Sequence, residues 1–329
     1  MTRFPATFAI PCRDAGPHLR PLLESLLAQT RQDFALLLVD DGSRDGSAEV
    51  ARAVAGERIE IHRNRAPLGM GANWNRCAEL VRTPYFCLAH QDDRYADRYL
   101  ERMLAALERH PETGLAHCKA WTLDPEGRRG LGRAERYKER FWARDPGPDP
   151  GAHFALLLRG NYVICPSVLY RTDVFRAAGG FRTDLRFALD WELWFRLLGM
   201  GHAPRGVPER LLGYRRHAAS ATAEAGAGVA RWSEEQAVLE GAIALGRARG
   251  WLPAGRPPLQ ALRNSVLHEF GVAVARGDSG GAETALRFLR ERVPALLLDP
   301  MVRVATRLAR LGPPGRAALR LLHALAVRV

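Results

Sequence analysis

The first 120 residues alternate short apolar runs with amphipathic stretches, and this alternation restricts the fold more than any other feature of the chain. In residues 17–30, leucines recur at positions 19, 22, 23, 26 and 27, which is the spacing of one helix face. Helices are also predicted over residues 47–55, 71–81 and 95–110, and buried strands over residues 7–10, 34–39, 59–62, 85–89 and 115–121. Strands that alternate with helices favour a mostly parallel sheet covered by helices on both faces, so we expect an α/β fold.

Beyond residue 123 this regular pattern is interrupted. Residues 124–152 are rich in Gly, Pro and charged side chains and predict a loop or a partly ordered lid. A helix over residues 190–198 and a strand over residues 210–216 follow. Strand signals end near residue 226, and helices are predicted over residues 229–250, 258–276, 281–292 and 295–328.

These patterns predict two domains. Residues 1–225 form an α/β domain, and residues 226–329 form a C-terminal helical region. We expect the α/β domain to consist of two halves, residues 1–123 and residues 124–225.

The composition is that of an ordinary globular protein. Hydrophobic residues make up 47% and charged residues 26% of the 329 residues, which excludes disordered and collagen-like chains. No run of 18 apolar residues predicts a membrane-spanning helix, and the N-terminus shows no signal-peptide pattern. Five cysteines without a CxxC pair argue against a disulfide framework and against a thiolate zinc site. We therefore expect a cytoplasmic protein with reduced cysteines.

The formal net charge of +12 indicates contact with an anionic partner, such as nucleic acid, anionic lipid or a phosphorylated substrate. Nucleic acid is disfavoured, because the sequence has no zinc-finger spacing, RNP-like aromatic motif or lysine-rich arm. The last 29 residues carry six arginines and no acidic residue, with Leu and Val at helical spacing between them. Two interpretations stay open for this stretch: the solvent-exposed face of a packed helical domain, or a surface that lies on anionic lipid.

Two pairs of carboxylates follow predicted strands. Asp40 and Asp41 follow the second strand, and Asp92 and Asp93 follow the fourth. The carboxyl ends of parallel strands form the usual ligand site of such a sheet. Four carboxylates at one edge would repel one another, and a divalent cation or the donors of a ligand would relieve that repulsion. A dinucleotide site and a P-loop are disfavoured, because PCRDAG rather than GxGxxG follows the first strand and no GxxxxGK[ST] motif occurs.

Four blocks of the sequence occur together in an order that is typical of one enzyme family. They are IPCRDAGPHLRPLLESLLAQTRQDFALLLVDDGSRDGS, PLGMGANWNRCAELVRTPYFCLAHQDD, GGFRTDLRFALDWELWFRL and YRRH. These blocks resemble the family 2 glycosyltransferases and cover residues 7 to about 220. The resemblance implies a GT-A fold, a nucleotide-sugar donor such as a UDP- or dTDP-sugar, a Mn²⁺ or Mg²⁺ ion, and inversion at the anomeric carbon.

The resemblance implies donor-binding roles for residues of the first two blocks. Asp41 is similar to the aspartate that hydrogen-bonds the nucleobase, and Pro11 and Arg13 lie on the loop that flanks the base. Asn75 is expected near the donor.

Asp92 and Asp93 stand at the end of the family's metal-binding DxD motif. The resemblance implies that one of them contacts the ribose and the other the metal, with Asp93 favoured for the metal. His90 departs from the family pattern, because many relatives carry the first Asp at this position.

The last block contains three further candidates. His217 resembles a histidine that reaches the diphosphate or the metal in some relatives, although a lone histidine is also typical of an exposed loop. Arg215 and Arg216 are candidates for bidentate pairing with phosphate oxygens.

Asp190, in LDWELW, is similar to the family's catalytic base. The acceptor hydroxyl must lose a proton as it attacks, and a carboxylate within hydrogen-bond reach can accept it. Glu192 is the competing base, but at i+2 on a helix it would point away from Asp190. A helix N-cap is the alternative role for Asp190. Trp191 and Trp194 flank it and are candidates for stacking on a sugar or for packing in the core.

The expected function is inverting transfer of a sugar from a nucleotide sugar to a hydroxyl of a glycan or lipid-linked acceptor in cell-surface polysaccharide synthesis. Residues 1–123 would bind the donor and residues 124–225 the acceptor, with the segment 124–152 closing over the donor to exclude water. The alternative is a non-catalytic relative that binds a nucleotide or glycan as a scaffold subunit, which His90 in place of Asp favours. Peripheral contact with the inner face of the membrane is a further open possibility.

Overall fold

Two compact units make up the chain. The structure is a computed structural model and describes residues 4–142, 146–216, 228–255 and 258–310, with residues 312, 315 and 317. The first unit comprises Met1–Phe154 and Asn161–His217, and the second comprises Ala155–Gly160 and Ala218–Val329. All five cysteines are buried thiols, and no disulfide joins them.

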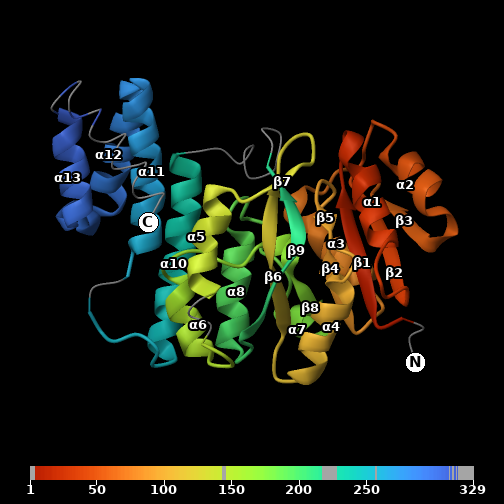
Figure 1. Ribbon diagram of the computed structural model, residues 1–329. Helices are drawn as coiled ribbons and strands as arrows, with labels where there is room; N and C mark the ends of the chain where they lie inside the picture. The colour runs from red at the N-terminus through yellow and green to blue at the C-terminus, as the bar shows by residue number, and fades with distance from the viewer. Residues whose placement is uncertain are drawn as a thin grey trace. The chain divides into compact units, whose positions relative to one another are not determined.

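A nine-stranded mixed sheet forms the centre of the first unit (Figure 1). Its strands are β1 (Ala6–Cys12), β2 (Phe34–Asp40), β3 (Ile59–Arg63), β4 (Tyr85–Leu88), β5 (Arg94–Tyr95), β6 (Leu115–Leu123), β7 (Arg129–Gly130), β8 (Leu169–Arg171) and β9 (Pro204–Arg215). They lie in the order β3-β2-β1-β4-β8-β6-β9-β5, and β7 pairs with β6. Strands β3, β2, β1 and β4 are parallel, as the alternating pattern predicts, and β6 is parallel to β9. Strand β8 is antiparallel to both β4 and β6.

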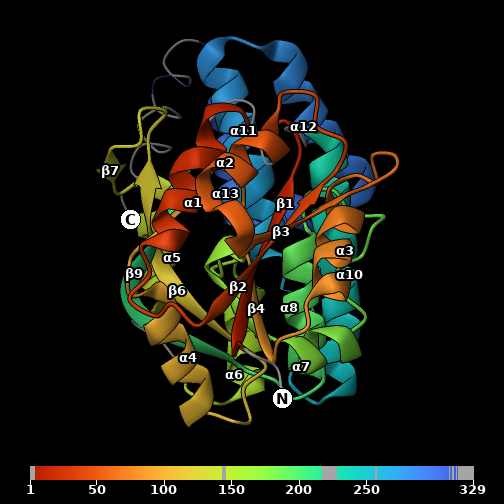
Figure 2. The same ribbon diagram turned by 90° about the vertical axis from the view of Figure 1, so that its right-hand side faces the viewer.

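Helices cover both faces of the sheet. They are α1 (Leu19–Leu27), α2 (Ser47–Ala55), α3 (Met70–Leu80), α4 (Tyr99–Arg109), α5 (Arg133–Trp142), α6 (Pro150–Leu157), α7 (Thr172–Ala177) and α8 (Leu189–Gly199). Figure 2 shows α1 and α4 on one side of the parallel strands and α3 and α8 on the other. The helices predicted over residues 17–30, 47–55, 71–81 and 190–198 are confirmed as α1, α2, α3 and α8.

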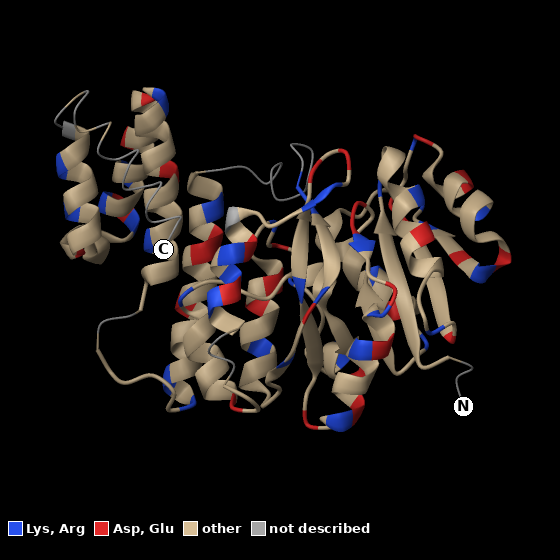
Figure 3. Cartoon of the chain, in the orientation of Figure 1, with Lys and Arg blue, Asp and Glu red and all other residues tan. Residues whose placement is uncertain are grey.

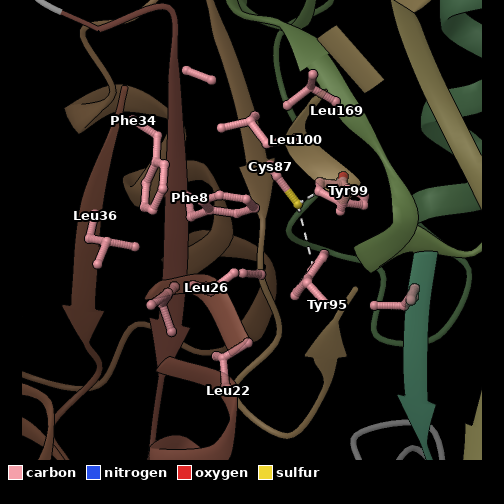
Figure 4. Packing of buried hydrophobic residues seen from close by; sticks show 14 of the residues in the cluster. Phe8, Leu22, Leu26, Phe34, Leu36, Cys87, Tyr95, Tyr99, Leu100 and Leu169 are labelled. Carbon is pink, nitrogen blue, oxygen red and sulfur yellow. Dashed lines mark hydrogen bonds between the residues drawn. The ribbon is translucent and has the colours of Figure 1, made fainter. Parts of the chain in front are cut away.

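One face of the sheet packs on α1 and α4. Phe8 of β1 points into this layer beside Leu22 and Leu26 of α1 (Figure 4). The Phe8 ring meets the ring of Phe34 edge-on at 5.2 Å and that of Tyr95 at 5.7 Å. Successive residues of a strand point to opposite faces, so the continuous apolar runs of the sequence correspond to strands buried on both faces.

The opposite face carries an aromatic layer that reaches the end of β4. Phe86 of β4 stacks on Tyr170 at 5.0 Å, and Tyr170 stacks on Trp194 of α8 at 6.0 Å. Trp74 of α3 meets the ring of His90 at 4.7 Å. Offset and edge-to-face ring pairs add to the stability that burial supplies. This layer therefore helps to hold α8 and the residues after β4 in place.

The prediction of a loop over residues 124–152 is wrong. This segment contains strand β7, all of helix α5 and the start of helix α6, and the sequence pattern also misses β5 and α7. On α5, Phe141 stacks on Tyr162 at 5.4 Å and Trp142 contacts the ring of His117 at 4.7 Å. Most other positions of α5 are charged, so its sequence is that of a solvated segment, whereas a few tertiary contacts stabilise the helix.

The described part of the second unit is helical. Its elements are α10 (Val229–Ala248), α11 (Gln260–Arg276), α12 (Ser279–Arg292), the 3₁₀ helix η4 (Pro294–Leu298) and α13 (Pro300–Arg310). The helices predicted over residues 229–250, 258–276 and 281–292 are confirmed. The first part of the helix predicted over residues 295–328 is divided into η4 and α13, and much of the rest lies outside the described residues. Trp232 of α10 packs on Phe288 of α12 at 5.3 Å. Within the described ranges, no helix is both long and apolar enough to cross a membrane.

Candidate active site

Hydrogen bonds tie together the loops that follow β1, β2 and β4. The backbone N–H of Arg13 donates to Oε1 of Gln91 at 2.8 Å, and its carbonyl accepts from Nε2 of Gln91 at 3.0 Å. Asp14 has a φ of +47°, and its N–H donates to Oγ of Ser43 at 3.0 Å. Pro11 lies in the buried end of β1, whereas Arg13 is exposed. These bonds hold in place the loop on which Pro11 and Arg13 are predicted to flank a nucleobase.

Asp41 is buried directly after β2, and its carboxylate accepts three hydrogen bonds. Oδ1 accepts from the N–H of Leu68 at 2.7 Å and from Nδ2 of Asn64 at 2.8 Å. Oδ2 accepts from the N–H of Gly69 at 3.0 Å. A carboxylate offers about four lone-pair positions, so three donors leave room for one more. Asp41 thus closes the loop that enters α3, and its contact with a nucleobase stays a prediction.

Both polar atoms of the Asn75 side-chain amide, on α3, have hydrogen-bond partners within the protein. Nδ2 donates to the carbonyl of Phe181 at 2.8 Å, and Oδ1 accepts from the N–H of Phe181 at 2.8 Å. Gly180, which precedes Phe181, has a φ of +71°, and a Cβ at this position would lie 2.5 Å from Oδ1 of Asn75. Asn75 therefore holds the glycine turn that precedes α8, and its predicted position near the donor remains untested.

The acidic pair after β4 consists of one fully buried and one partly exposed residue. Oδ1 of Asp93 accepts from the N–H of Arg215 at 2.9 Å, while Oδ2 has no hydrogen-bond partner among the described residues. Burial, together with the charge of Asp92, raises the pKa of Asp93 well above its usual range. His90 packs on Trp74, and burial lowers the pKa of its ring to about 4, so the imidazole is neutral at pH 7.

The residues after β4 fit a divalent cation. Oδ2 of Asp93 and Nε2 of His90 are buried without a partner in the described part of the chain, and carboxylate and neutral imidazole are both metal ligands. The described residues contain no group of three or more His, Cys, Asp or Glu side chains that could hold a metal by themselves. Nucleotide enzymes commonly bind Mg²⁺ through one or two carboxylates and substrate phosphates. A donor diphosphate would supply the remaining ligands here.

Asp190 lies in the first turn of α8. Its Oδ1 accepts from the N–H of Trp191 at 2.7 Å, and its Oδ2 accepts from Nδ2 of Asn161 at 3.1 Å. Ala188 is the N-cap residue of α8, so the N-cap alternative for Asp190 is wrong. Burial raises the pKa of Asp190, whereas the charge of Lys138 and these two hydrogen bonds lower it.

Lys138 of α5 is a charged neighbour of Asp190 that the sequence analysis does not identify. Burial lowers the pKa of Lys138 to about 8, and the charge of Asp190 raises it. The available signal is compositional, because Lys119 and Lys138 are the only lysines among 48 basic residues. A segment interpreted as a loop offers no reason to place this lysine near Asp190.

The buried thiol of Cys165 connects the two acidic parts of the site. Burial raises the pKa of Cys165 well above its usual range, and the charges of Asp190 and Asp93 contribute to the rise. Its Sγ lies 3.9 Å from the hydroxyl of Tyr170. The charges of Asp93 and Asp190 therefore both act on this thiol, although the two residues lie far apart in the sequence.

The other candidates on α8 have structural partners. Glu192 forms an ion pair with Arg196 at 2.6 Å, one turn along the helix. Trp191 and Trp194 are 5% and 2% exposed. Both rings are buried, so of the two roles left open the structure supports packing in the core.

Arg215 and Arg216 have partners within the protein, and the pairing of either with phosphate oxygens stays a prediction. Nε of Arg215 donates to the carbonyl of Asp92 at 2.9 Å. Arg216 pairs with the buried carboxylate of Glu135 at 2.7 Å and so joins the end of β9 to α5. His217 lies outside the described residues, and its predicted role stays a prediction.

Solved structures with low sequence identity share this fold. S. aureus TarS, in complex with UDP-GlcNAc, aligns with a TM-score of 0.62 at 14% identity, covering 98% of this chain and 92% of that chain. The mannosyltransferase PcManGT from Pyrobaculum calidifontis, in complex with GDP-Man and Mn²⁺, aligns with a TM-score of 0.57 at 16% identity, covering 99% and 86%. This likeness confirms the expected GT-A fold.

Sequence relatives match between 57% and 64% of the chain. The uncharacterized protein MT1568 of Mycobacterium tuberculosis is 30% identical over 216 residues, which are 64% of this chain and 66% of that protein. The putative glycosyltransferase EpsE of Bacillus subtilis is 25% identical over 57% of this chain and 65% of its own length. The amylovoran biosynthesis glycosyltransferase AmsE of Erwinia amylovora is 26% identical over 62% and 72%. The chain thus spans just under two thirds of MT1568 and EpsE.

A family profile covers strands β1 to β8 of the sheet and the acidic pairs at its edge. The profile described as Glycosyl transferase family 2 matches residues 7–175, which are 169 of the 329 residues. The matched range contains Asp41 and the acidic pair after β4, and it ends shortly before α8. The chain therefore belongs to glycosyl transferase family 2.

Proposed function

We propose that this protein is an inverting glycosyltransferase that moves a sugar from a UDP- or dTDP-sugar to a hydroxyl of a glycan or lipid-linked acceptor in cell-surface polysaccharide synthesis. Family membership supports sugar transfer. Proteins of the same fold were solved with UDP-GlcNAc and with GDP-Man, which supports a nucleotide-sugar donor. A relative named for amylovoran biosynthesis supports a polysaccharide product.

The observation that carries this proposal is the placement of Asp190. Its carboxylate is held by Asn161 on Oδ2 and by its own helix on Oδ1, near a lysine that favours the charged form. A carboxylate in this state can accept the proton of an acceptor hydroxyl as the oxygen attacks the anomeric carbon. Attack from the side opposite the leaving diphosphate inverts the configuration of that carbon.

We propose that Asp92 and Asp93 hold a Mn²⁺ or Mg²⁺ ion beside the donor diphosphate. Asp92 is partly exposed, whereas Asp93 is 1% exposed and anchors Arg215 through Oδ1. Asp92 is therefore the better placed of the two to reach a diphosphate-bound ion from the solvent side, while Asp93 would offer its unpartnered Oδ2 to the ion and holds the loop through Oδ1. When bound, the ion would neutralise charge that builds on the leaving nucleoside diphosphate.

Calorimetric titration of UDP, dTDP and GDP tests the donor site. We expect one of the three nucleotides to bind in the presence of Mn²⁺ and about tenfold more weakly after the metal is removed with EDTA. Asp92→Asn should lose this metal dependence, because one carboxylate oxygen is replaced by an amide nitrogen. Asp97→Asn is the matched control, because Asp97 is an exposed aspartate of the same segment.

The same titration separates the enzyme from a scaffold protein. A nucleotide that binds equally well with and without metal, together with no sugar transfer, would favour the non-catalytic alternative and overturn the transferase assignment. An equal loss of metal dependence in Asp97→Asn would show that Asp92 is not the ligand.

A basic and partly apolar surface on η4 and α13 supports contact with a membrane. Leu298, Met301 and Val304 are 69%, 50% and 51% exposed. Arg303 and Arg307 lie on α13, which carries no acidic residue (Figure 3). Apolar side chains that enter the interface, beside arginines that pair with lipid phosphates, are typical of peripheral membrane helices. We propose that this surface brings the protein to an anionic membrane that carries its acceptor.

Sedimentation with vesicles tests the membrane contact. We expect the full chain to bind phosphatidylglycerol-containing vesicles and not pure phosphatidylcholine vesicles, and to release them as salt increases. Replacing Leu298, Met301 and Val304 together by Ser should weaken binding about tenfold or more, because three apolar side chains no longer enter the interface. Val229→Ser is the control, since Val229 is 45% exposed elsewhere in the second unit. Equal binding of the triple variant and the control would contradict the proposal.

A further inference from the structure

Helix α5 packs on the sheet through one face. Glu135 is buried, and its Oε2 accepts from Oγ1 of Thr122 on β6 at 2.7 Å. Phe141 stacks on Tyr162 at 5.4 Å with an angle of 16° between the rings. Lys138 stands three positions after Glu135 and three before Phe141, and residues three or four apart lie on the same face of a helix. The packing of α5 therefore turns Lys138 toward the protein.

The segment that packs on α5 also holds Asp190. Tyr162 supplies the ring that stacks on α5, and its preceding neighbour Asn161 donates to Oδ2 of Asp190 at 3.1 Å. The adjacent residues Asn161 and Tyr162 thus contact the Asp190 carboxylate and the packed face of α5, which is the face that carries Lys138.

We propose that Lys138 is a positioning residue for sugar transfer, the cation that holds the Asp190 carboxylate in its ionised, proton-accepting form. This proposal rests on the proposed function, in which Asp190 is the base. The neighbouring cation, Arg216, cannot fill this role in the same way, because its guanidinium pairs with Glu135. Lysine suits the position, since its ammonium is a compact charge on a flexible stem.

The electrostatic balance around the pair sets the direction of the expected change. Burial raises the pKa of Asp190, and the charge of Lys138 is the largest effect that lowers it. Burial also lowers the pKa of Lys138 to about 8, against the charge of Asp190. The other ionisable groups around the pair are Glu135, Arg216, His117, Cys165 and Tyr170. Without Lys138 the pKa of Asp190 rises, so Asp190 becomes protonated, and unable to accept a proton, at a higher pH.

Carbon-13 NMR of protein labelled at the aspartate Cγ measures this effect without any substrate. The resonance of Asp190 is identified by its absence in Asp190→Asn. In Lys138→Met we expect this resonance to titrate about 1 pH unit higher, or more, than in the unmodified protein. Lys138→Arg keeps the charge and should titrate close to the unmodified protein. Arg136→Met is the matched control, because it removes an exposed cation from the same helix.

An unchanged titration of Asp190 in Lys138→Met would overturn the proposal, and so would an equal shift in Arg136→Met. If circular dichroism shows that Lys138→Met does not fold, Lys138→Gln replaces it and the same outcomes apply. A merely structural role for Lys138 would lower the unfolding temperature and leave the Asp190 titration in place. Failure of the calorimetric panel in the unmodified protein would reject the proposed transferase instead, independently of the NMR result.

Discussion

Replacing Asp190 by Asn is expected to lower the rate of sugar transfer by about 10³-fold and to leave nucleotide binding unchanged. Asn has nearly the same shape, and its Oδ1 can still accept from the N–H of Trp191, which Asp190 binds at 2.7 Å. It cannot take a proton from the acceptor hydroxyl. The measurements are turnover with the donor class that the calorimetric panel identifies, and the affinity for the matching nucleotide.

Glu192→Gln is the matched control for this variant. Glu192 is the other acidic residue in the first turn of α8, and its carboxylate pairs with Arg196. Loss of this ion pair affects the packing of α8 but not proton transfer, so activity should remain within a few-fold of the unmodified protein. Full activity in Asp190→Asn, or an equally deep loss in Glu192→Gln, would contradict the assignment of Asp190 as the base.

Replacing Phe8 by Ala is expected to lower the free energy of unfolding of the first unit by about 3–5 kcal/mol. Phe8 is 1% exposed, and its ring meets those of Phe34, Tyr95 and Tyr99 at 5.2, 5.7 and 5.9 Å. These rings belong to β2, β5 and α4, so they cannot collapse together into the space that the smaller side chain leaves. The expected loss therefore has two parts: the lost burial of the ring and the free energy of the cavity that remains.

Denaturant unfolding followed by tryptophan fluorescence measures this change, because five of the seven tryptophans lie in the first unit. Leu68→Ala is the control, since Leu68 is 50% exposed and its loss should cost no more than about 0.5 kcal/mol. A loss below about 1 kcal/mol in Phe8→Ala would show that the core repacks around the smaller residue.

The candidate site was predictable where its residues stand in local motifs. Asp41 and the pair Asp92 and Asp93 follow strands whose apolar runs are visible in the sequence, and Asp190 stands at the start of a helix with regular spacing. The partners of these residues were not predictable in the same way. Asn75 shows this clearly, because its hydrogen bonds reach Phe181, 106 positions further along the chain.

The two arginines at the end of β9 also have partners that the sequence could not predict. Their sequence suggests phosphate binding, yet Arg215 reaches the backbone of Asp92 and Arg216 pairs with Glu135 of α5. A guanidinium has several donors and is equally suited to a carboxylate, a carbonyl or a phosphate. Its partner depends on which groups the fold brings near, and that information is not local.

Local patterns were sufficient to predict the order of β1, α1, β2, α2, β3, α3 and β4, because side-chain periodicity alone selects helix or strand when one face must be buried. Helix α5 has no such pattern. Contacts of Glu135, Phe141 and Trp142 with distant residues stabilise it instead. Long-range packing therefore placed Asn161 beside Asp190 and turned the face of α5 that carries Lys138 toward the same segment. The charge state of a buried carboxylate depends on such neighbours, and they meet only when the chain has folded.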